Sequence, residues 1–241
     1  MEKVSLFGMS AVVCGEGEPL LMLHGFLSSK ESFLRQIRFF SRFYKVIAVD
    51  LAGFGENGDL KKPYSLDTYL EEIINLIDFF GGKAIVMGHS FGGRISIKLA
   101  SEHPEKVKAL VLVDSAGLKP RRGIKYFYRK TGYFFMKKFL SRERIEKKYF
   151  SPDYIGLSPN MKGTFNLVTK EFLDCKLGKI DAFTLIVWGK NDKETPLYMA
   201  KKLHKGIKNS RLYLIEGAGH FPFIDKFDEF NFVVKEFLSE V

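Results

Sequence analysis

Short runs of consecutive apolar residues alternate along the chain with longer segments in which apolar residues recur every three or four positions. A short continuous apolar run indicates a strand buried on both faces, and the longer spacing indicates a helix with one buried side. Strands that alternate with helices favour a mostly parallel sheet covered by helices on both faces. The predicted strands are 4–7, 11–14, 20–23, 46–50, 84–87, 109–114, 184–188 and 211–215.

This alternation stops after Gly117 and resumes at residue 184. We therefore expect a core formed by residues 1–118 and 184–241, interrupted by an insertion at 119–183. The insertion also carries the excess positive charge of the chain. The whole sequence has 38 Lys or Arg and 28 Asp or Glu, and residues 119–150 contain twelve Lys or Arg and two Glu. The remaining 26 basic and 26 acidic residues balance, so the entire excess of +10 lies in one aromatic-rich segment.

Ser90 stands in a glycine-rich turn, Gly88–Gly93, between a predicted strand and a predicted helix. A serine on such a turn projects its hydroxyl above the edge of the sheet, and small neighbours avoid collisions there. The amides at the start of the following helix point to the same place, where negative charge develops during acyl transfer. The turn alone also fits an ordinary strand–helix connection.

Other polar residues follow later strands, at the sheet edge where reactive groups gather in parallel sheets. Asp114 follows one strand, Asp192 lies in a loop after the next, and His220 lies in a glycine loop after the last. Ser90, Asp192 and His220 thus occur in the order nucleophile, acid, base. Asp114 is the alternative acid. We favour Asp192 because its loop is Gly-x-x-Asp before a proline, and we expect Asp114 to cap the exit into the insertion.

The sequence resembles the α/β-hydrolase superfamily, in the branch of small esterases and carbon–carbon bond hydrolases with a helical cap. Five motifs in order carry the resemblance: His24-Gly25-Phe26, Asp50-Leu51-Ala52-Gly53-Phe54-Gly55, Gly88-His89-Ser90-Phe91-Gly92-Gly93, Trp188-Gly189-Lys190-Asn191-Asp192 and Gly219-His220. The resemblance implies an eight-stranded α/β-hydrolase sheet, with residues 119–183 as a helical cap over the active site.

It also implies roles for the residues at the strand ends. Ser90 would be the nucleophile, His220 the general base and Asp192 the acid that orients the imidazole. The N–H groups of Phe26 and Phe91 would bind the oxyanion. We expect His24, Phe127, Phe134, Phe135 and Phe221 to line the substrate pocket, although His24 and His89 also suit a structural role.

These roles predict a serine carboxylesterase that cleaves small to medium apolar esters through an acyl-enzyme on Ser90. One alternative is a carbon–carbon bond hydrolase that acts on dienoate ring-cleavage products. Such enzymes often have Trp after the catalytic histidine, where this chain has Phe221. Another alternative is a ligand-binding protein that keeps the fold without catalysis.

No cofactor or metal is expected, because no His-x-x-His or carboxylate cluster occurs in the sequence. Two widely separated cysteines and the absence of a signal peptide indicate a cytoplasmic protein. The basic segment suits a solvated lid, attraction of anionic substrates, or weak contact with an anionic membrane surface. Nucleic acid is not an expected partner, because no recognition motif accompanies the charge.

Overall fold

The computed structural model describes residues 2–121, 144 and 152–241, and its strands form one sheet in the order β1-β2-β4-β3-β5-β6-β7-β8. β2 is antiparallel to both β1 and β4, and all other neighbours are parallel. The predicted mostly parallel, eight-stranded sheet is confirmed. Its strands are β1 Glu2–Leu6, β2 Met9–Cys14, β3 Pro19–Leu23, β4 Lys45–Val49, β5 Ala84–His89, β6 Val107–Val113, β7 Phe183–Gly189 and β8 Ser210–Ile215.

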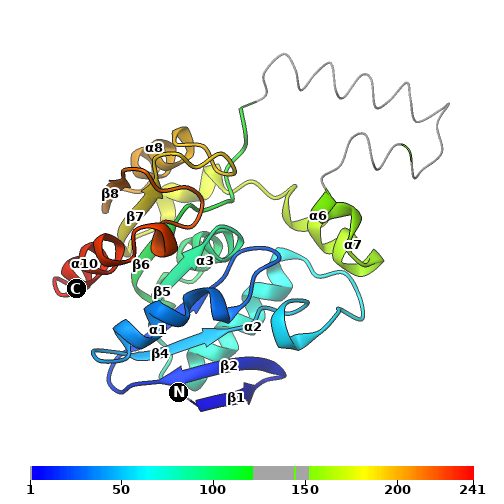
Figure 1. Cartoon of the computed structure of the whole chain (residues 1–241), viewed down its shortest axis with the longest axis horizontal. Coiled ribbons are helices and arrows are strands. Elements are labelled where there is room, and N and C mark those ends of the chain that lie inside the picture. Colours follow the sequence, from blue (N-terminus) through cyan, green and yellow to red (C-terminus); the bar gives the residue numbers. More distant parts are fainter. Residues whose placement is uncertain (1, 122–143, 145–151) are drawn as a thin grey trace.

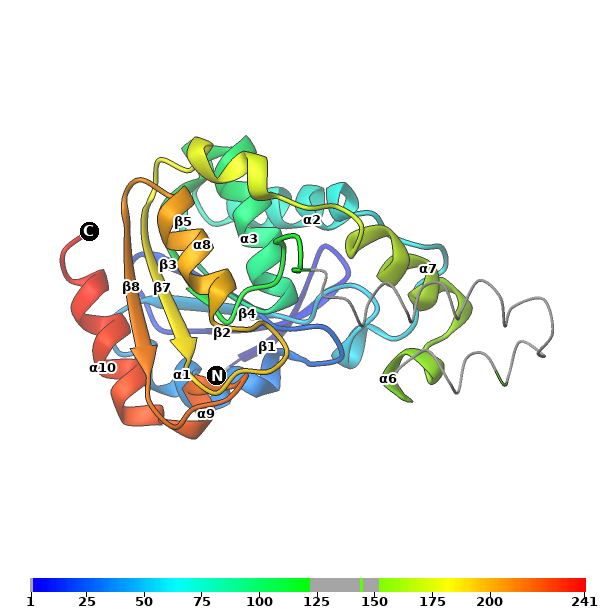
Figure 2. The same cartoon turned by 90° about the horizontal axis from the view of Figure 1, so that it is seen from above.

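Helices cover both faces of this sheet (Figures 1 and 2). The described helices are α1 Leu34–Phe40, α2 Leu66–Phe79, α3 Phe91–Glu102, α6 Pro152–Ile155, α7 Pro159–Val168, α8 Tyr198–Gly206, α9 Pro222–Asp225 and α10 Phe227–Leu238. Four short 3₁₀ segments join them: Lys30–Phe33, Gly55–Asn57, Pro104–Lys106 and Asp174–Lys179. In Figure 2, α2, α3 and α8 lie on one side of the sheet, and α1 and α10 lie on the other.

Each central strand contributes to two apolar layers, which explains why its sequence is apolar at every position. In β3, Leu21 and Leu23 pack with the helices α2, α3 and α8, whereas Leu20 and Met22 pack with α1 and α10. All four side chains have at most 1% of their surface exposed. Because β3 to β8 run parallel, their carboxyl ends meet at one edge of the sheet, where the candidate site lies.

The first helical segment differs from its prediction. The sequence favours one helix from Ser29 or Ser32 to about Phe43, but the chain forms a 3₁₀ turn before α1 and ends that helix at Phe40. The N–H of Lys30 donates to the carboxylate of Asp50 at 2.8 Å, and this contact fixes where the 3₁₀ turn begins. This bond to a residue that follows β4 is a tertiary contact that local periodicity does not encode.

The insertion leaves and re-enters the core at adjacent points. The N–H of Leu173 donates to the carbonyl oxygen of Gly117 at 2.9 Å. Leu173, Leu177 and Ile180 are then buried in the same apolar layer as α3. Part of the segment expected in the cap thus packs on the core, which favours an end of the cap near residue 172; the boundary at residue 183 stays a prediction.

The described part of the insertion includes α6 and α7, which lie beside the loop before α2 and away from β8 (Figures 1 and 2). The hydroxyl of Ser158 accepts from the N–H of Met161 and caps α7. Thr164 of α7 accepts a hydrogen bond from the N–H of Tyr64 at 2.8 Å. No helix in the described residues is long and apolar enough to cross a membrane.

Candidate active site

Ser90 occupies a strained turn between β5 and α3, with φ 50° and ψ −108°. A left-handed backbone is costly for a residue other than glycine and persists only where its surroundings hold it. Here the Ser90 N–H donates to the carbonyl of Val113 at 3.0 Å, and the Ser90 carbonyl accepts from Ala116 at 2.9 Å. A Cβ at Gly92 would overlap the carbonyl group of Leu23. The predicted tight turn with obligatory small neighbours is confirmed.

His220 and Asp192 meet after the last two strands of the sheet. His220 Nδ1 lies 2.8 Å from Oδ2 of Asp192, and the Asp192 side chain is buried. Burial alone would raise the pKa of Asp192, but hydrogen bonds from His220, Thr195 and Asp114 outweigh it and lower the pKa to about 2. An ionised Asp192 accepts a hydrogen bond from Nδ1–H, so the ring proton stays on Nδ1 and Nε2 of His220 is the acceptor nitrogen.

His89 joins the His220 loop to the turn that carries Ser90. Its Nε2 donates to the main-chain oxygen of His220 at 2.7 Å, and the two rings lie 4.8 Å apart. Burial lowers the pKa of His89 to about 3, so the ring is neutral and structural. In the described part of the chain, no hydrogen bond joins the Ser90 hydroxyl to the His220 ring. Catalytic hydrogen bonds often shorten only once substrate is bound.

The loop after β3 brings Phe26 to the same place. A Cβ on Gly25 would lie 3.3 Å from Cβ of Ser90, so the two turns are in contact. The rings of Phe26 and Phe91 are 5.7 Å apart. Within the described residues, no turn or loop hydrogen bond uses the N–H of Phe26 or of Phe91. Both main-chain donors predicted for an oxyanion are therefore near Ser90.

His24 is placed differently from its expected position in the pocket wall. Its side chain has no exposed surface. The N–H of Leu51 donates to Nε2 at 3.0 Å, so Nδ1 carries the proton and donates to the Gly25 oxygen at 2.7 Å. Burial lowers the pKa of His24 to about 4 and keeps it neutral. His24 therefore braces two loops, which matches the structural role and not the pocket role.

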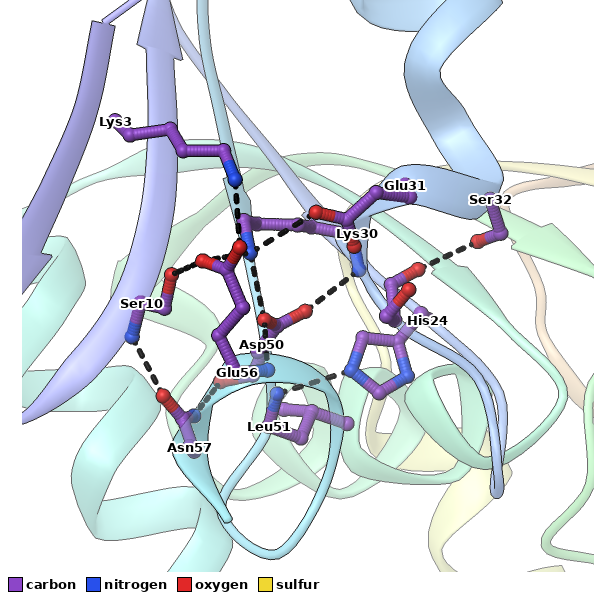
Figure 3. Close-up of polar contacts among 11 residues, drawn as sticks. Lys3, Ser10, His24, Lys30, Glu31, Ser32, Asp50, Leu51, Glu56 and Asn57 are labelled. Carbon is purple, nitrogen blue, oxygen red and sulfur yellow. Dashed lines mark hydrogen bonds and ion pairs between the residues drawn. The ribbon is translucent and has the colours of Figure 1, made fainter.

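A buried ion pair supports the loop that holds Phe26 (Figure 3). Lys30 Nζ lies 2.7 Å from Oδ2 of Asp50 and 3.0 Å from Oε2 of Glu56. The carboxylate of Asp50 also accepts the N–H groups of Lys30 and Glu56, and its main-chain oxygen accepts from Asn57. Asp50 thus organises the loop that follows β4. The burial of Lys30 could not be predicted from the polar residues around it.

Aromatic side chains surround Phe26 on the side of the insertion. The ring of Phe26 lies 4.8 Å from Phe54 and 5.3 Å from Phe165 of α7, and Phe165 lies 5.3 Å from Tyr154 of α6. The side chains of Phe26, Phe165 and Tyr154 are only partly buried. They give the surroundings of Ser90 an apolar wall that joins the core to the insertion.

Among the other residues expected in the pocket, Phe221 is 38% exposed and its ring lies 5.4 Å from His220. It therefore borders the site on its open side. Phe127, Phe134 and Phe135 lie outside the described residues.

Asp114 also reaches this site, but its side chain does not cap the insertion. Its Oδ1 accepts from the N–H of Gly189 at 3.0 Å, which joins the ends of β6 and β7. Oxygen and nitrogen atoms of Asp114, Asp192 and His220 lie within 4.8 Å of one another. Of the described residues, these three form a group that could hold a metal ion, although Asp192 and His220 already bond to each other.

The alpha/beta hydrolase family model matches residues 20–231 of this sequence. The chain belongs to the alpha/beta hydrolase family. It is 28% identical over 247 residues to a 2-hydroxy-6-oxo-6-(2'-aminophenyl)hexa-2,4-dienoic acid hydrolase of Metapseudomonas resinovorans, covering 93% of this chain and 85% of that protein. It is 30% identical over 242 residues to Lipase 1 of Psychrobacter immobilis, covering 88% and 74%.

The fold agrees with solved structures of this hydrolase family. A membrane phospholipase A described as a bacterial virulence factor superposes with a TM-score of 0.80 at 25% identity, covering 99% of this chain and 85% of that chain. The family resemblance inferred from the sequence motifs is thus confirmed, and the chain is a hydrolase by family.

Proposed function

We propose that the protein is a serine hydrolase in which Ser90 is the nucleophile, His220 the general base and Asp192 the orienting acid. The observation that carries the proposal is the 2.8 Å bond from His220 Nδ1 to Asp192, on a loop that His89, the neighbour of the strained Ser90, holds at 2.7 Å. A structural serine has no need of a left-handed backbone, nor of a nearby imidazole that is bonded to a buried acid.

The reaction follows from these positions. His220 Nε2 takes the proton of the Ser90 hydroxyl as Oγ bonds to the ester carbonyl carbon, and the carbonyl π electrons move to oxygen. The N–H groups of Phe26 and Phe91 stabilise that oxyanion. The intermediate collapses, the carbon–oxygen bond to the alcohol breaks, and the leaving alkoxide takes the proton from His220. Water then repeats these steps on the acyl-enzyme and releases the acid.

The preferred substrate class is a small to medium apolar carboxylic ester. The wall of Phe26, Phe165 and Tyr154 supports this choice, because aromatic rings bind alkyl or aryl groups. A lipase among the relatives also fits ester cleavage.

A second candidate is hydrolysis of a carbon–carbon bond in a dienoate ring-cleavage product. The similarity to a dienoic acid hydrolase over 93% of the chain favours it. Such a substrate carries a carboxylate, which needs a cation or several N–H donors in the pocket. A third candidate, ligand binding without catalysis, leaves the arrangement of Ser90, Asp192 and His220 without a purpose.

The decisive experiment combines covalent labelling with a substrate panel. We expect a fluorophosphonate to label wild-type protein on Ser90, and Ser90→Ala to abolish both labelling and turnover. Folded wild-type protein that stays unlabelled would exclude the catalytic proposal. Hydrolysis of p-nitrophenyl esters of increasing chain length, beside a dienoate substrate, separates ester from carbon–carbon activity.

A matched pair of acid variants tests the role of Asp192. Asp192→Asn should lower turnover by about four orders of magnitude, because the imidazole then adopts the wrong tautomer. Asp114→Asn should lower turnover far less than Asp192→Asn. The reverse order would move the acid role to Asp114.

We further propose that the enzyme works in the cytoplasm, consistent with free Cys14 and Cys175. Weak contact of the basic segment with anionic membranes stays a prediction, since residues 122–143 and 145–151 lie outside the described part of the chain. Fractionation of cells and vesicle sedimentation test the two statements.

A further inference from the structure

Asp114 is a fully buried carboxylic residue directly after β6, next to the strand that leads to Asp192. Its backbone has a φ of 40°, a left-handed value that a non-glycine residue adopts only when neighbours hold it. The Thr195 hydroxyl donates its one hydrogen to Oδ2 of Asp192 at 2.5 Å, and the main-chain oxygen of Asp114 lies 3.0 Å from the same hydroxyl oxygen. Thr195 therefore holds the two acidic residues side by side.

The two carboxyl groups receive very different numbers of donors. Asp192 accepts from the N–H groups of Glu194 and Thr195, from the Thr195 hydroxyl and from His220. The Asp114 side chain accepts one N–H, from Gly189, on Oδ1. Its Oδ2 is buried, and no N–H or O–H donor reaches it from the described residues. The arrangement stabilises negative charge on Asp192 and not on Asp114.

The charged groups around Asp114 reinforce this difference. Asp192 faces it from the loop after β7, and Asp225 of α9 adds a second negative charge. His89 is neutral, and His220 is already bonded to Asp192. No Lys or Arg of the described residues forms an ion pair with Asp114. Two buried carboxylates this close, without a cation, repel each other strongly.

We infer that Asp114 is protonated at neutral pH and donates its O–H to Asp192, so that two buried carboxyl groups share one negative charge beneath His220. The proton gives the buried Oδ2 of Asp114 the partner that it lacks as a carboxylate. Burial, followed by the hydrogen bond with Asp192 and its charge, raises the pKa of Asp114 far above its ordinary value. Such a pair titrates as one unit.

The consequence for catalysis rests on the proposed function. Asp114 is a positioning residue, since it contacts Asp192 and not the reacting atoms. Its hydrogen bond fixes the Asp192 carboxylate and withdraws part of its negative charge. His220 therefore faces a weaker anion than an isolated aspartate would present.

Infrared spectroscopy of the whole protein tests the protonation without any assay of activity. The difference spectrum of wild type minus Asp114→Asn at pH 7.5 should contain the C=O stretch of a protonated carboxylic acid. The band should persist to pH 9. Carboxylate bands in its place at pH 7.5, with or without a metal found by elemental analysis, would overturn the inference.

The pH dependence of kcat/KM gives a second reading, provided that the protein is active. Asn at position 114 can accept from Gly189 and donate to Asp192, as a protonated Asp does, so the midpoint of the acid limb should stay within about 0.3 pH units of wild type. Asp114→Leu removes the donor and should raise that midpoint. If Asp114 were ionised, Asp114→Asn would lower the midpoint by about one unit.

The infrared band and fluorophosphonate labelling together separate the shared proton from the proposed catalysis at Ser90. A protonated acid band in a protein that fluorophosphonate cannot label would contradict the proposed function and keep the shared proton. Labelling of Ser90 without the acid band would support the proposed function and contradict the shared proton. Should Asp114→Leu fail to fold, the infrared spectrum and the pH dependence of kcat/KM in Asp114→Asn still decide whether Asp114 is protonated.

Discussion

Lys30 Nζ lies 2.7 Å from Oδ2 of Asp50, and the two side chains are 1% and 0% exposed. This buried pair ties the loop that carries Phe26 to the end of β4 (Figure 3). Breaking a buried pair from one side is costly because the remaining charge has lost its partner.

Lys30→Met should therefore destabilise the protein by about 3 kcal/mol or more, measured by urea unfolding. Lys3→Met is the matched control, because Lys3 also bonds to Glu56 but is 63% exposed. Lys3→Met should lower the free energy of unfolding by about 1 kcal/mol or less. Adding Asp50→Asn to Lys30→Met should recover part of the stability. Equal effects of the two lysine variants would contradict this account.

The same pair predicts how stability depends on pH. Burial alone would lower the pKa of Lys30, but hydrogen bonds to Asp50, Glu56 and Glu31 outweigh it and raise the pKa above 10.5. A raised lysine pKa stabilises the fold fully below the unfolded value and loses that contribution as pH rises through the folded value.

The stability difference between wild type and Lys30→Met should thus be constant from pH 7 to 10 and shrink above pH 10.5. Urea midpoints across this range provide the measurement. A difference that falls between pH 7 and 9 would show that another group is responsible.

Phe165 is expected to limit the length of the acyl group, because its ring closes the apolar wall against Phe26 at 5.3 Å. Phe165→Ala should shift the preference of kcat/KM from short towards longer p-nitrophenyl esters by about tenfold. Leu167→Ala is the control, since Leu167 lies on the same helix and is 49% exposed. An unchanged chain-length profile in Phe165→Ala would remove this ring from the pocket.

Arg94 should hold the end of α7 against α3. Its buried Nη1 donates to the carbonyl oxygens of Val168 at 2.6 Å and Glu171 at 2.5 Å. Arg94→Met leaves these carbonyls without that donor, so hydrogen exchange in residues 159–173 should accelerate by about tenfold or more. Lys170→Met, on the exposed side of the same segment, should have little effect. Equal exchange in both variants would show that other contacts hold α7.

The sequence predicted well those features that depend on short-range pattern. Central strands such as β3 are apolar at every position because both of their faces are buried. The positions of Ser90, Asp192 and His220 followed from the parallel sheet, which gathers the residues after each strand at one edge. The turn at Ser90 was predictable because its glycines report close backbone contacts.

Features that depend on a distant partner were not predictable. Lys30 sits in a polar run that suggests exposure, and its partner Asp50 is 20 positions away. Asp114 was expected to cap the insertion, but its side chain bonds to Gly189, 75 positions later. Likewise, nothing near Arg94 in the sequence indicates that it binds carbonyl groups beyond residue 167. Only the folded chain brings these groups together.

The hydrogen bond from the Leu173 N–H to the Gly117 carbonyl oxygen brings the two ends of the insertion together at the core. Its two ends meet there whatever lies between them, so the length of the intervening chain adds little to the cost of closing the loop. The corresponding segment of a relative could therefore be exchanged for residues 118–172, provided that it replaces the buried contacts of Leu118, Met161 and Val168 with the core. If Ser90 acts as proposed, exchanging the insertion should change the choice of substrate and leave the chemistry at Ser90 unchanged.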